Sequence, residues 1–346
     1  MTAPSPRQLT AAFSRLSEAS AAALLATSHG VEAVRIERLA TERDDSFRLD
    51  TEHGTLVAKF AHPLDDPRSL HDQVAVLEAL RRNHAELPVQ RVLPGLDGAL
   101  VHRVTDDAGQ ARSVRVLSYL EGELLGARTR SLDDLHALGR FHARFAAAIA
   151  AIGDTDPALR GSETAWNLLR FELYAPHADD LADPPLRDDV RRVLDRAQSR
   201  VLARLEALPA VLAHNDLHGD NVLVSADPFA VTGVLDFGDM TRTPRVADLA
   251  VAASYARGRA PSTVEPWAAA ETYLVGYGAV QPLTDDERSL LPELVLLRLA
   301  QRGILNSAIA AANPQASGYA SRNLSAIARD LRELGASIPS TIGGPE

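Results

Sequence analysis

The hydrophobic pattern of the chain changes near residue 121, and this change constrains the fold most strongly. Before that point, short segments alternate apolar and polar residues or carry β-branched runs, and turn signals such as "EHG" and "LDG" separate them. Such segments are typical of antiparallel strands joined by hairpins. After that point, apolar residues recur mostly at helical spacing. The sequence therefore predicts an α+β chain, in which a small antiparallel sheet precedes a mainly helical region.

Four segments have the clearest helical periodicity. They span residues 7–28, 67–84, 131–152 and 185–208. The third begins with Ser131 and Asp134 in the spacing of a capping box, which marks a helix N-terminus. The leucine- and alanine-rich run at 290–312 is expected to be core. One β-like patch, "NVLVSADPFAVTGVLDFGDM" at 221–240, interrupts the helices and predicts a hairpin in their midst.

Composition limits the classes of protein to consider. The chain has 346 residues, enough for two domains or one two-lobed domain. Its net charge of -10 argues against a nucleic-acid partner, because phosphate binding usually needs a basic face. The absence of cysteine excludes disulfides and thiolate metal sites. No signal peptide and no apolar run of roughly 18 residues is evident, so we expect a cytoplasmic protein without a membrane span.

The segment "HNDLHGDNVLV", residues 214–224, carries the sharpest chemical signal. His214, Asp216 and Asn221 have the spacing H-x-D-x-x-x-x-N, and Asp236 follows in "VLDFGD". Phosphoryl transfer needs a carboxylate that orients the attacking hydroxyl, oxygen ligands for Mg²⁺, and a cation on the phosphates. Asp216 suits the first task, while Asn221 and Asp236 suit the second. The predicted hairpin would bring both ligands to one point.

These motifs resemble those of protein-kinase-like phosphotransferases, and in detail those of the aminoglycoside phosphotransferase family. His218 stands where protein kinases carry a lysine. "TERDDSFRL" is similar to the glycine-poor nucleotide loop of the family, and "VTGVLDFGDMTRTPRVADLAVAASYA" is most similar to its hydroxylysine kinase branch. "AWNLLRF" resembles a W-D-L motif of the same branch, with Asn167 in place of an aspartate. The resemblance covers about residues 18–330.

The resemblance implies a protein-kinase-like fold with two lobes. An N-terminal nucleotide-binding lobe, residues 1–117, would hold the small sheet and one helix. A hinge at 118–122 would join it to a helical catalytic and substrate lobe at 123–346. It also implies Mg²⁺ as cofactor and ATP, or GTP, as co-substrate.

Lys59 is the only lysine in a chain with 36 basic residues. The resemblance puts it on the third strand of the N-terminal lobe, where the family has its phosphate-binding lysine. A compact ammonium suits a point contact to two phosphates better than a planar guanidinium. A carboxylate from the helix at 67–84 should pair with it, and both Glu78 and Asp72 are candidates.

Other residues are expected around the nucleotide and the acceptor. Ser46 and its neighbours would cover the phosphates through backbone amides. The extended segment Ser118, Tyr119 and Leu120 would offer backbone groups to adenine, as the resemblance implies.

Four further side chains near the motifs have candidate roles. His214 is expected to order the catalytic loop, and Asp248 to hold that loop as a buried cap. His218 either touches substrate or phosphate, or packs within the loop. Asp239 either lies behind the metal ligands or anchors a substrate amine.

The function expected from these observations is a kinase that phosphorylates a hydroxyl of a small, amine-bearing metabolite, with hydroxylysine as the best single guess. A second hypothesis is an antibiotic-inactivating phosphotransferase, with an acidic rim formed by Asp179, Asp180 and Asp183. A third is a catalytically inactive nucleotide-binding pseudokinase. The acceptor, the choice of ATP or GTP, a metabolic or resistance role, and the oligomeric state stay open at the level of sequence.

Overall fold

The computed structural model describes residues 11, 13–41, 44–258, 265–312 and 323–344. These residues divide into two compact units, an N-terminal unit that ends at Glu121 and a C-terminal unit that starts at Gly122. The division falls within the predicted hinge at 118–122.

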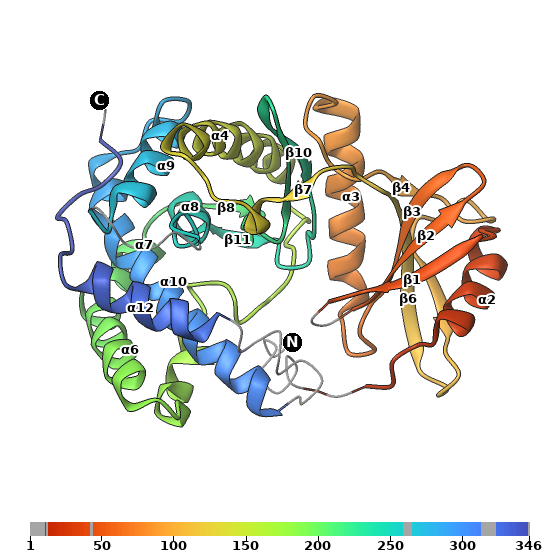
Figure 1. The fold of residues 1–346 in the computed structure, drawn as a ribbon, viewed down its shortest axis with the longest axis horizontal. Helices are drawn as coiled ribbons and strands as arrows, with labels where there is room; N and C mark the ends of the chain where they lie inside the picture. The colour runs from red at the N-terminus through yellow and green to blue at the C-terminus, as the bar shows by residue number, and fades with distance from the viewer. Residues whose placement is uncertain (1–10, 12, 42–43, 259–264, 313–322, 345–346) are drawn as a thin grey trace. The chain divides into compact units, whose positions relative to one another are not determined.

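The N-terminal unit is built on a six-stranded antiparallel sheet (Figure 1). Its strands lie in the order β1-β2-β3-β6-β4, and β5 also pairs with β6. The strands are β1 Arg35–Leu39, β2 Asp45–Thr51, β3 Gly54–Phe60, β4 Val92–Leu93, β5 His102–Thr105 and β6 Ala111–Ser118. The predicted "EHG" turn joins β2 to β3, where Gly54 adopts a φ of 124°.

One face of this sheet packs against helix α2, Glu18–His29, in an apolar core. Phe47 and Phe60 meet edge to face in this core, with ring centroids 5.9 Å apart. Of the helix predicted at 7–28, the described residues 13–17 are not helical, because Ser17 is the N-cap of α2 and accepts the Ser20 amide hydrogen. Its residues 7–10 and 12 lie outside the described part of the chain.

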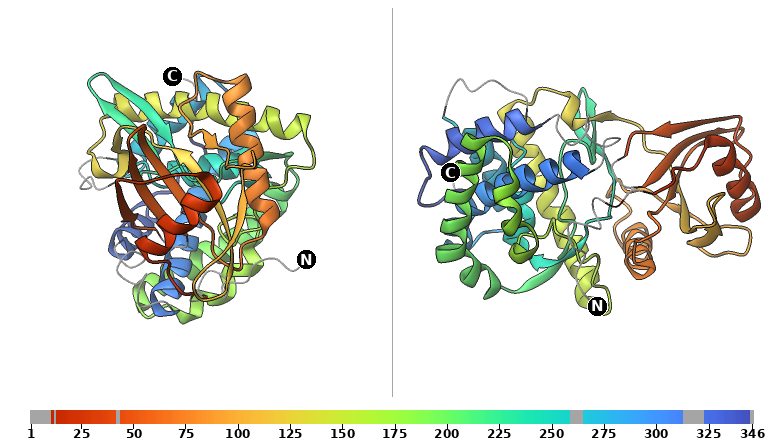
Figure 2. Two further views of the ribbon diagram at one scale, coloured as in Figure 1. Left: turned by 90° about the vertical axis from the view of Figure 1, so that its right-hand side faces the viewer. Right: turned by 90° about the horizontal axis from the view of Figure 1, so that it is seen from below.

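The other face of the sheet carries a buried polar row. Ser46 pairs with Lys59, and Lys59 pairs with Arg115. Directly paired residues point to the same face, so these three side chains form one row across β2, β3 and β6. Helix α3, Pro67–Asn83, lies on the side of the sheet opposite α2 (Figures 1 and 2). The prediction that Lys59 lies on a strand of this sheet is confirmed.

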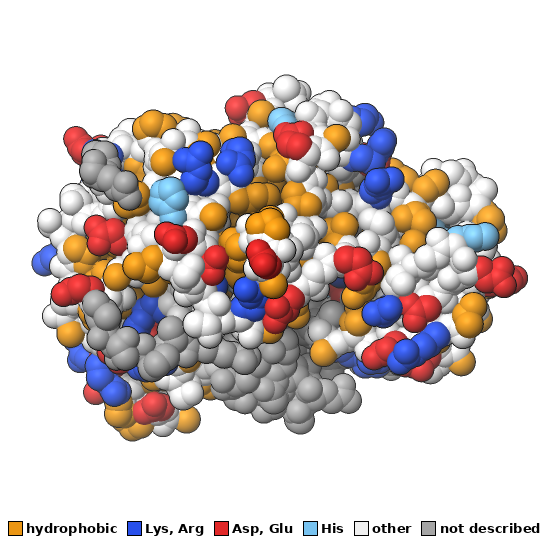
Figure 3. Space-filling model, turned by 45° about the horizontal axis from the view of Figure 1, so that its top comes forward, with side chains coloured by type: hydrophobic (Ala, Val, Ile, Leu, Met, Phe, Trp, Pro, Cys, Tyr) orange, Lys and Arg blue, Asp and Glu red, His pale blue; other side chains and the backbone are white. Residues whose placement is uncertain are grey.

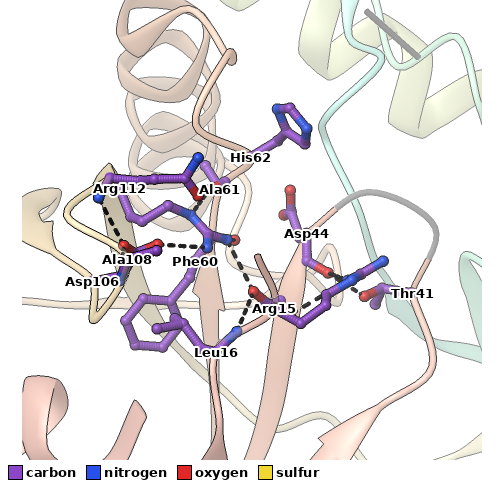
Figure 4. Close-up of polar contacts among 12 residues, drawn as sticks. Arg15, Leu16, Thr41, Asp44, Phe60, Ala61, His62, Asp106, Ala108 and Arg112 are labelled. Atoms are coloured by element: carbon purple, nitrogen blue, oxygen red, sulfur yellow. Dashed lines mark hydrogen bonds and ion pairs between the residues drawn. The ribbon is translucent and has the colours of Figure 1, made fainter. Parts of the chain in front are cut away.

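Asp45, a fully buried carboxylate, ties together the segment before α2 and strands β2 and β6. It accepts hydrogen bonds from the Leu16 amide at 3.1 Å and from Arg112 at 3.1 Å, and it also contacts Arg38. Arg112 also donates to the carbonyl oxygens of Phe60 and Ala61 (Figure 4). Burial raises the pKa of Asp45, but the Leu16 amide and the guanidinium groups outweigh it, so the pKa lies below its ordinary value.

The C-terminal unit is mainly helical. Its helices are α4 Leu132–Thr155, α5 Phe171–Tyr174, α6 Pro184–Arg196, α7 Leu202–Glu206, α8 Arg245–Ala253, α9 Ala268–Gly278, α10 Asp285–Ala312 and α12 Leu324–Gly335. Its strands form two small sheets, β10-β9-β7 and β11-β8. They are β7 Glu123–Leu124, β8 Ala210–Ala213, β9 Val222–Ala226, β10 Phe229–Val234 and β11 Thr241–Pro244. The predicted hairpin at 221–240 is therefore confirmed as β9 and β10.

Helix α4 begins with the predicted capping box, in which Ser131 and Asp134 exchange side-chain and backbone hydrogen bonds. It crosses α9 at very short distance. A Cβ on Gly139 would lie 2.0 Å from the Tyr273 carbonyl oxygen, and one on Gly276 would lie 2.2 Å from that of His136. Glycine is therefore required on both helices at this crossing.

Helix α10 is the core helix of the C-terminal unit, as predicted for residues 290–312. It has 28 residues, and among the described helices it alone has the length and hydropathy of a membrane span. However, 72% of its apolar window is buried inside the protein. That burial is typical of a core helix. Arg298, Gln301 and Arg302 are also buried within it, so the helix is not uniformly apolar.

On the face drawn in Figure 3, acidic and basic side chains are interspersed with each other and with apolar ones. Nucleic-acid-binding surfaces usually gather Lys and Arg on one face. The described residues on this face show no such gathering.

We predict that Asp45→Ala destabilises the N-terminal unit by about 3–5 kcal/mol, because the buried Arg112 loses the nearer of its two buried carboxylates, Asp45 at 3.1 Å, and keeps only Asp106 at 3.6 Å. Urea unfolding and hydrogen exchange of peptides from residues 11–121 would measure the effect. A depressed folded pKa contributes stability that is present above the unfolded value of about 3.9 and lost as pH falls through the folded value. The stability of Asp45→Ala should therefore fall less than that of the wild-type protein as pH is lowered through this range.

Glu37→Gln is the matched control, since Glu37 pairs with Arg35 on the surface, where its side chain is 53% exposed. Its loss should change stability by less than about 1 kcal/mol. Equal effects of the two variants would contradict the role assigned to Asp45.

Candidate active site

The loop between β8 and β9 contains the predicted catalytic residues, and a buried carboxylate on α8 holds it. Asn215 has a left-handed φ of 62°. Its amide donates to Asp248 Oδ1 at 2.6 Å, while Asp248 Oδ2 lies 2.9 Å from His142 Nε2 on α4. The Tyr273 hydroxyl on α9 contacts His142 Nδ1 at 3.0 Å. The prediction that Asp248 holds this loop is confirmed.

His214 orders the base of the same loop. Its Nε2 lies 3.2 Å from the Leu235 carbonyl oxygen, and its Nδ1 accepts the Asp216 amide hydrogen at 3.3 Å. Its ring packs edge to face on Phe237, with centroids 4.9 Å apart. Burial lowers the pKa of His214, so the ring stays neutral. These contacts fit the predicted ordering role.

Three side chains surround the Asp216 carboxylate. Asn221 Nδ2 donates to Oδ2 at 2.8 Å, and His218 Nε2 lies 3.2 Å from the same oxygen. Arg298 donates to Oδ1 at 3.1 Å. Burial raises the pKa of Asp216, but His218 and Arg298 outweigh it and hold the pKa below its ordinary value. Asp216 is therefore an ionised carboxylate at neutral pH and is able to accept a proton.

The predicted metal ligands come together at the ends of the β9–β10 hairpin. The Leu235 amide donates to the Asn221 carbonyl at 2.8 Å, and Asp236 follows directly. Asp236 has a left-handed φ of 56°, and the Gly238 amide donates to its Oδ1 at 3.1 Å. Because the Asn221 amide nitrogen faces Asp216, its side-chain oxygen is the donor left for a metal.

These oxygen donors fit Mg²⁺, which prefers oxygen ligands and usually keeps several waters. Among the described residues, no group of three or more His, Cys, Asp and Glu is arranged to hold a metal. An ion at Asn221 and Asp236 would therefore take its remaining ligands from phosphates and water.

Asp239 lies in the same acidic neighbourhood. Burial and the charges of Asp216 and Asp236 raise the pKa of Asp239 to about 8, although a hydrogen bond from Thr164 opposes the shift. A carboxyl in these surroundings holds a proton near neutral pH and gives it up when a cation approaches. No pattern in the sequence indicated that Thr164 would lie here.

Two buried arginines of α10 were not expected from the sequence. Arg298 donates to the Trp166 carbonyl and to Gln301 at 2.8 Å each, in addition to its bond with Asp216. The Arg302 guanidinium lies 3.7 Å from the ring centroid of Tyr255. The only signal in the sequence is a pair of charges four residues apart within a strongly apolar helix.

Asn167, the departure from the W-D-L motif, has a structural role. Its side-chain oxygen accepts the Leu169 amide hydrogen at 3.0 Å and a hydrogen bond from Thr243 at 3.3 Å. It thereby ties the segment before α5 to β11.

The candidate nucleotide residues lie in the N-terminal unit. Lys59 is 9% exposed and Ser46 is 1% exposed, in the buried polar row. The Ser118 amide donates to the Arg91 carbonyl, and its carbonyl accepts from Gln90, so its backbone groups already have partners. Residues 42 and 43 of the predicted nucleotide loop lie outside the described part of the chain.

The two acids proposed as partners of Lys59 have different surroundings on α3. The Glu78 carboxylate bonds to Arg81 at 3.0 Å, one turn further along the helix. Asp72 is buried, with 7% of its surface exposed. A buried carboxylate is the better match for a buried ammonium, because an unmatched charge of either kind is costly inside a protein.

A sheet unit with a buried lysine, followed by a helical unit with this loop and hairpin, defines the class: the chain has a protein-kinase-like fold. Residues 35–283 match the model of the phosphotransferase enzyme family, and the chain belongs to that family. It is an enzyme that transfers a phosphoryl group to a hydroxyl of a small molecule.

Curated relatives include hydroxylysine kinases. That of Danio rerio is 26% identical over 290 residues, which cover 80% of this chain and 79% of the relative. That of Mus musculus is 25% identical over 309 residues, covering 82% and 80%.

Two solved structures share the fold. An amicoumacin kinase, solved in complex with AMP-PNP, Ca²⁺ and Ami, superposes with a TM-score of 0.70 at 18% identity, covering 94% of this chain and 96% of its own. A microcompartment-associated aminopropanol kinase superposes with a TM-score of 0.59 at 20% identity, covering 93% and 100%. At these identities the likeness establishes the fold alone.

We predict that Asp248→Ala lowers turnover and destabilises the protein by about 1–3 kcal/mol, because the Asn215 amide and His142 each lose a buried partner. Thermal unfolding and steady-state kinetics would measure both effects. Tyr273→Phe is the milder control, since it removes one hydrogen bond to His142, a loss of about 1 kcal/mol. Full activity in Asp248→Ala would contradict the role of Asp248 in holding the loop.

Proposed function

We propose that the enzyme transfers the γ-phosphoryl group of ATP, or GTP, to the hydroxyl of a small, amine-bearing metabolite, with hydroxylysine as the best single candidate. The observation that carries the proposal is the ionised Asp216 held beside Asn221, with Asp239 close to it in an acidic neighbourhood. Hydroxylysine kinases among the relatives support the choice of acceptor.

Asp216 is proposed as the base. Its carboxylate orients the acceptor hydroxyl and accepts its proton as the oxygen attacks phosphorus. Arg298 and His218 keep the carboxylate ionised and hold its two oxygens in place.

Asn221 and Asp236 are proposed to hold Mg²⁺. When bound, the ion neutralises the charge of the nucleotide phosphates. The two ligands lie on one hairpin, so their spacing depends on the register of β9 and β10.

Lys59 is proposed to hold the α- and β-phosphates, with Asp72 rather than Glu78 as its acidic partner. Burial of Asp72 and the engagement of Glu78 by Arg81 support this choice. Ser46, in the same row as Lys59, would lie under the phosphates. The Tyr119 amide already donates to the Thr55 carbonyl at 3.4 Å, so Tyr119 would offer its carbonyl, and Leu120 its backbone groups, to the base of the nucleotide.

Asp239 is proposed to bind the amine of the acceptor. An ammonium beside it would favour the ionised carboxylate and offset the charges of Asp216 and Asp236. This arrangement suits a cationic acceptor.

The surface acids weaken the case for a polycationic antibiotic. Asp179 bonds to Arg191 at 2.7 Å, and Asp180 lies 3.1 Å from His177. Asp183 occupies the N-cap position of α6. Two of the three proposed rim acids thus already contact a basic side chain, which reduces the negative potential available to a drug.

We predict that Asp216→Asn lowers kcat by about 10²–10⁴-fold, because the amide cannot accept the hydroxyl proton. A coupled nucleotide-consumption assay over hydroxy amino acids, amino alcohols and aminoglycosides would measure this on the best acceptor. Circular dichroism would check that the variant is folded. Unchanged turnover would refute the assignment of Asp216 as the base.

We predict that Asp72→Asn raises the KM for ATP more than Glu78→Gln does, because only the first removes a carboxylate buried on α3. Lys59→Arg should also raise it, since a planar guanidinium replaces a compact ammonium. The ratio of the two KM values decides between the acids. A larger effect of Glu78→Gln would reverse the choice.

A further inference from the structure

Two arginines four residues apart are buried on the core helix α10. Arg298 is 1% exposed and Arg302 is 7% exposed. Residues four apart on a helix are neighbours on one face, so the two guanidinium groups repel each other. Burying one such charge without a counter-ion is strongly unfavourable. Each arginine therefore needs an anion.

The anion for Arg298 is Asp216, at 3.1 Å. Within the described part of the chain, no carboxylate forms a direct ion pair with Arg302. Its guanidinium lies over the ring of Tyr255, and its Nε is buried without a hydrogen-bond partner there. Burial lowers the pKa of Arg302, with Arg298 adding to the effect.

Asp330, a second acid whose charge acts on Arg302, is already engaged. Asp330 lies 2.9 Å from Arg257 and 2.9 Å from Arg329. Two guanidinium groups thus share its charge, which leaves little of it for Arg302.

Arg302 is linked through neighbouring rings to the proposed base, Asp216. Its charge acts on Asp216, and the ring of Tyr255 that it covers stacks on His218, with centroids 4.5 Å apart and planes at 16°. His218 in turn contacts Asp216. An anion bound to Arg302 would therefore lie near the carboxylate that orients the hydroxyl.

We propose that Arg302, with Arg298 one helical turn away, forms a subsite for a carboxylate of the acceptor. The acceptor is then a hydroxylated amino acid, with its carboxylate at Arg302 and an amine at Asp239. This inference rests on the proposed function and narrows it. A planar guanidinium suits the two oxygens of a carboxylate, which it binds in a bidentate manner.

The subsite would also select against other acceptors. An amino alcohol leaves Arg302 without its counter-charge, and a polycationic aminoglycoside would bring further positive charge to it.

The transferring phosphoryl group is a second possible source of the anion. Acceptors with and without a carboxylate separate the two sources, because both kinds receive the same phosphoryl group.

The test compares matched acceptors with the wild-type enzyme and with Arg302→Gln. The acceptors are 5-hydroxylysine and its decarboxylated analogue 1,5-diaminopentan-2-ol. Arg302→Gln should raise the KM for hydroxylysine by about 10- to 100-fold and leave the KM for the analogue unchanged. Arg302→Lys should fall between, since it keeps the charge without the planar fork. Arg192→Gln, which removes a largely exposed arginine of α6, is the control.

An equal rise in KM for both acceptors would overturn the subsite, because it would mean that Arg302 contacts the transferring phosphoryl group or stabilises the fold. A wild-type enzyme that uses the analogue as well as hydroxylysine would overturn it too, while the proposed kinase function would stand.

Calorimetry without nucleotide separates the remaining cases. Binding of hydroxylysine that weakens in Arg302→Gln supports the subsite even if no amine-bearing alcohol is phosphorylated, in which case the proposed function alone fails. Absence of both binding and turnover for hydroxy amino acids overturns both.

Discussion

The catalytic loop depends on the buried Asp248 carboxylate. Asn215 takes a left-handed conformation that a side chain tolerates only when its surroundings hold it, and Asp248 supplies that hold through the Asn215 amide. Asp248 is in turn positioned by His142 on α4, and His142 by Tyr273 on α9. The close crossing of α4 and α9 at Gly139 and Gly276 brings these partners together. The packing of α4 against α9 therefore helps to position the loop that contains Asn215.

Within the site, two aspartates have pKa values shifted in opposite directions. Burial acts on both, but cations outweigh it at Asp216, whereas neighbouring acids reinforce it at Asp239. Such separation lets one site hold an ionised carboxylate beside a carboxyl that keeps its proton until a cation approaches. The cations at Asp216 come from within the loop, through His218, and from α10, through Arg298.

Helix α10 departs from the rule that a core helix buries apolar residues. Its length and hydropathy suit a buried core element, yet it holds two arginines and Gln301 away from water. Violations of this kind are expected where a protein builds a site rather than a core. Arg298 is accounted for by its contact with Asp216, and Arg302 by the carboxylate that we propose for the acceptor.

Much of the fold and the centre of the site could be predicted from sequence because the signals are local. Periodicity indicated the sheet, the helices and the hairpin, and the spacing from Asp216 to Asp236 placed the proposed base and the proposed metal ligands on one loop and hairpin. The prediction of helix at residues 13–17 was wrong, because the capping role of Ser17 rather than periodicity decides where α2 begins.

The sequence by itself determined the contacts between residues that lie close together along the chain. The tertiary structure alone decided which residues from distant parts of the chain contact them. Arg298 joins Asp216 across 82 positions, and His142 joins Asp248 across 106. Periodicity reports which face of a helix is buried, but it carries no information on which buried polar group will lie opposite. Only the packing of helices determines these contacts, because a buried charge is tolerated only where a partner lies beside it.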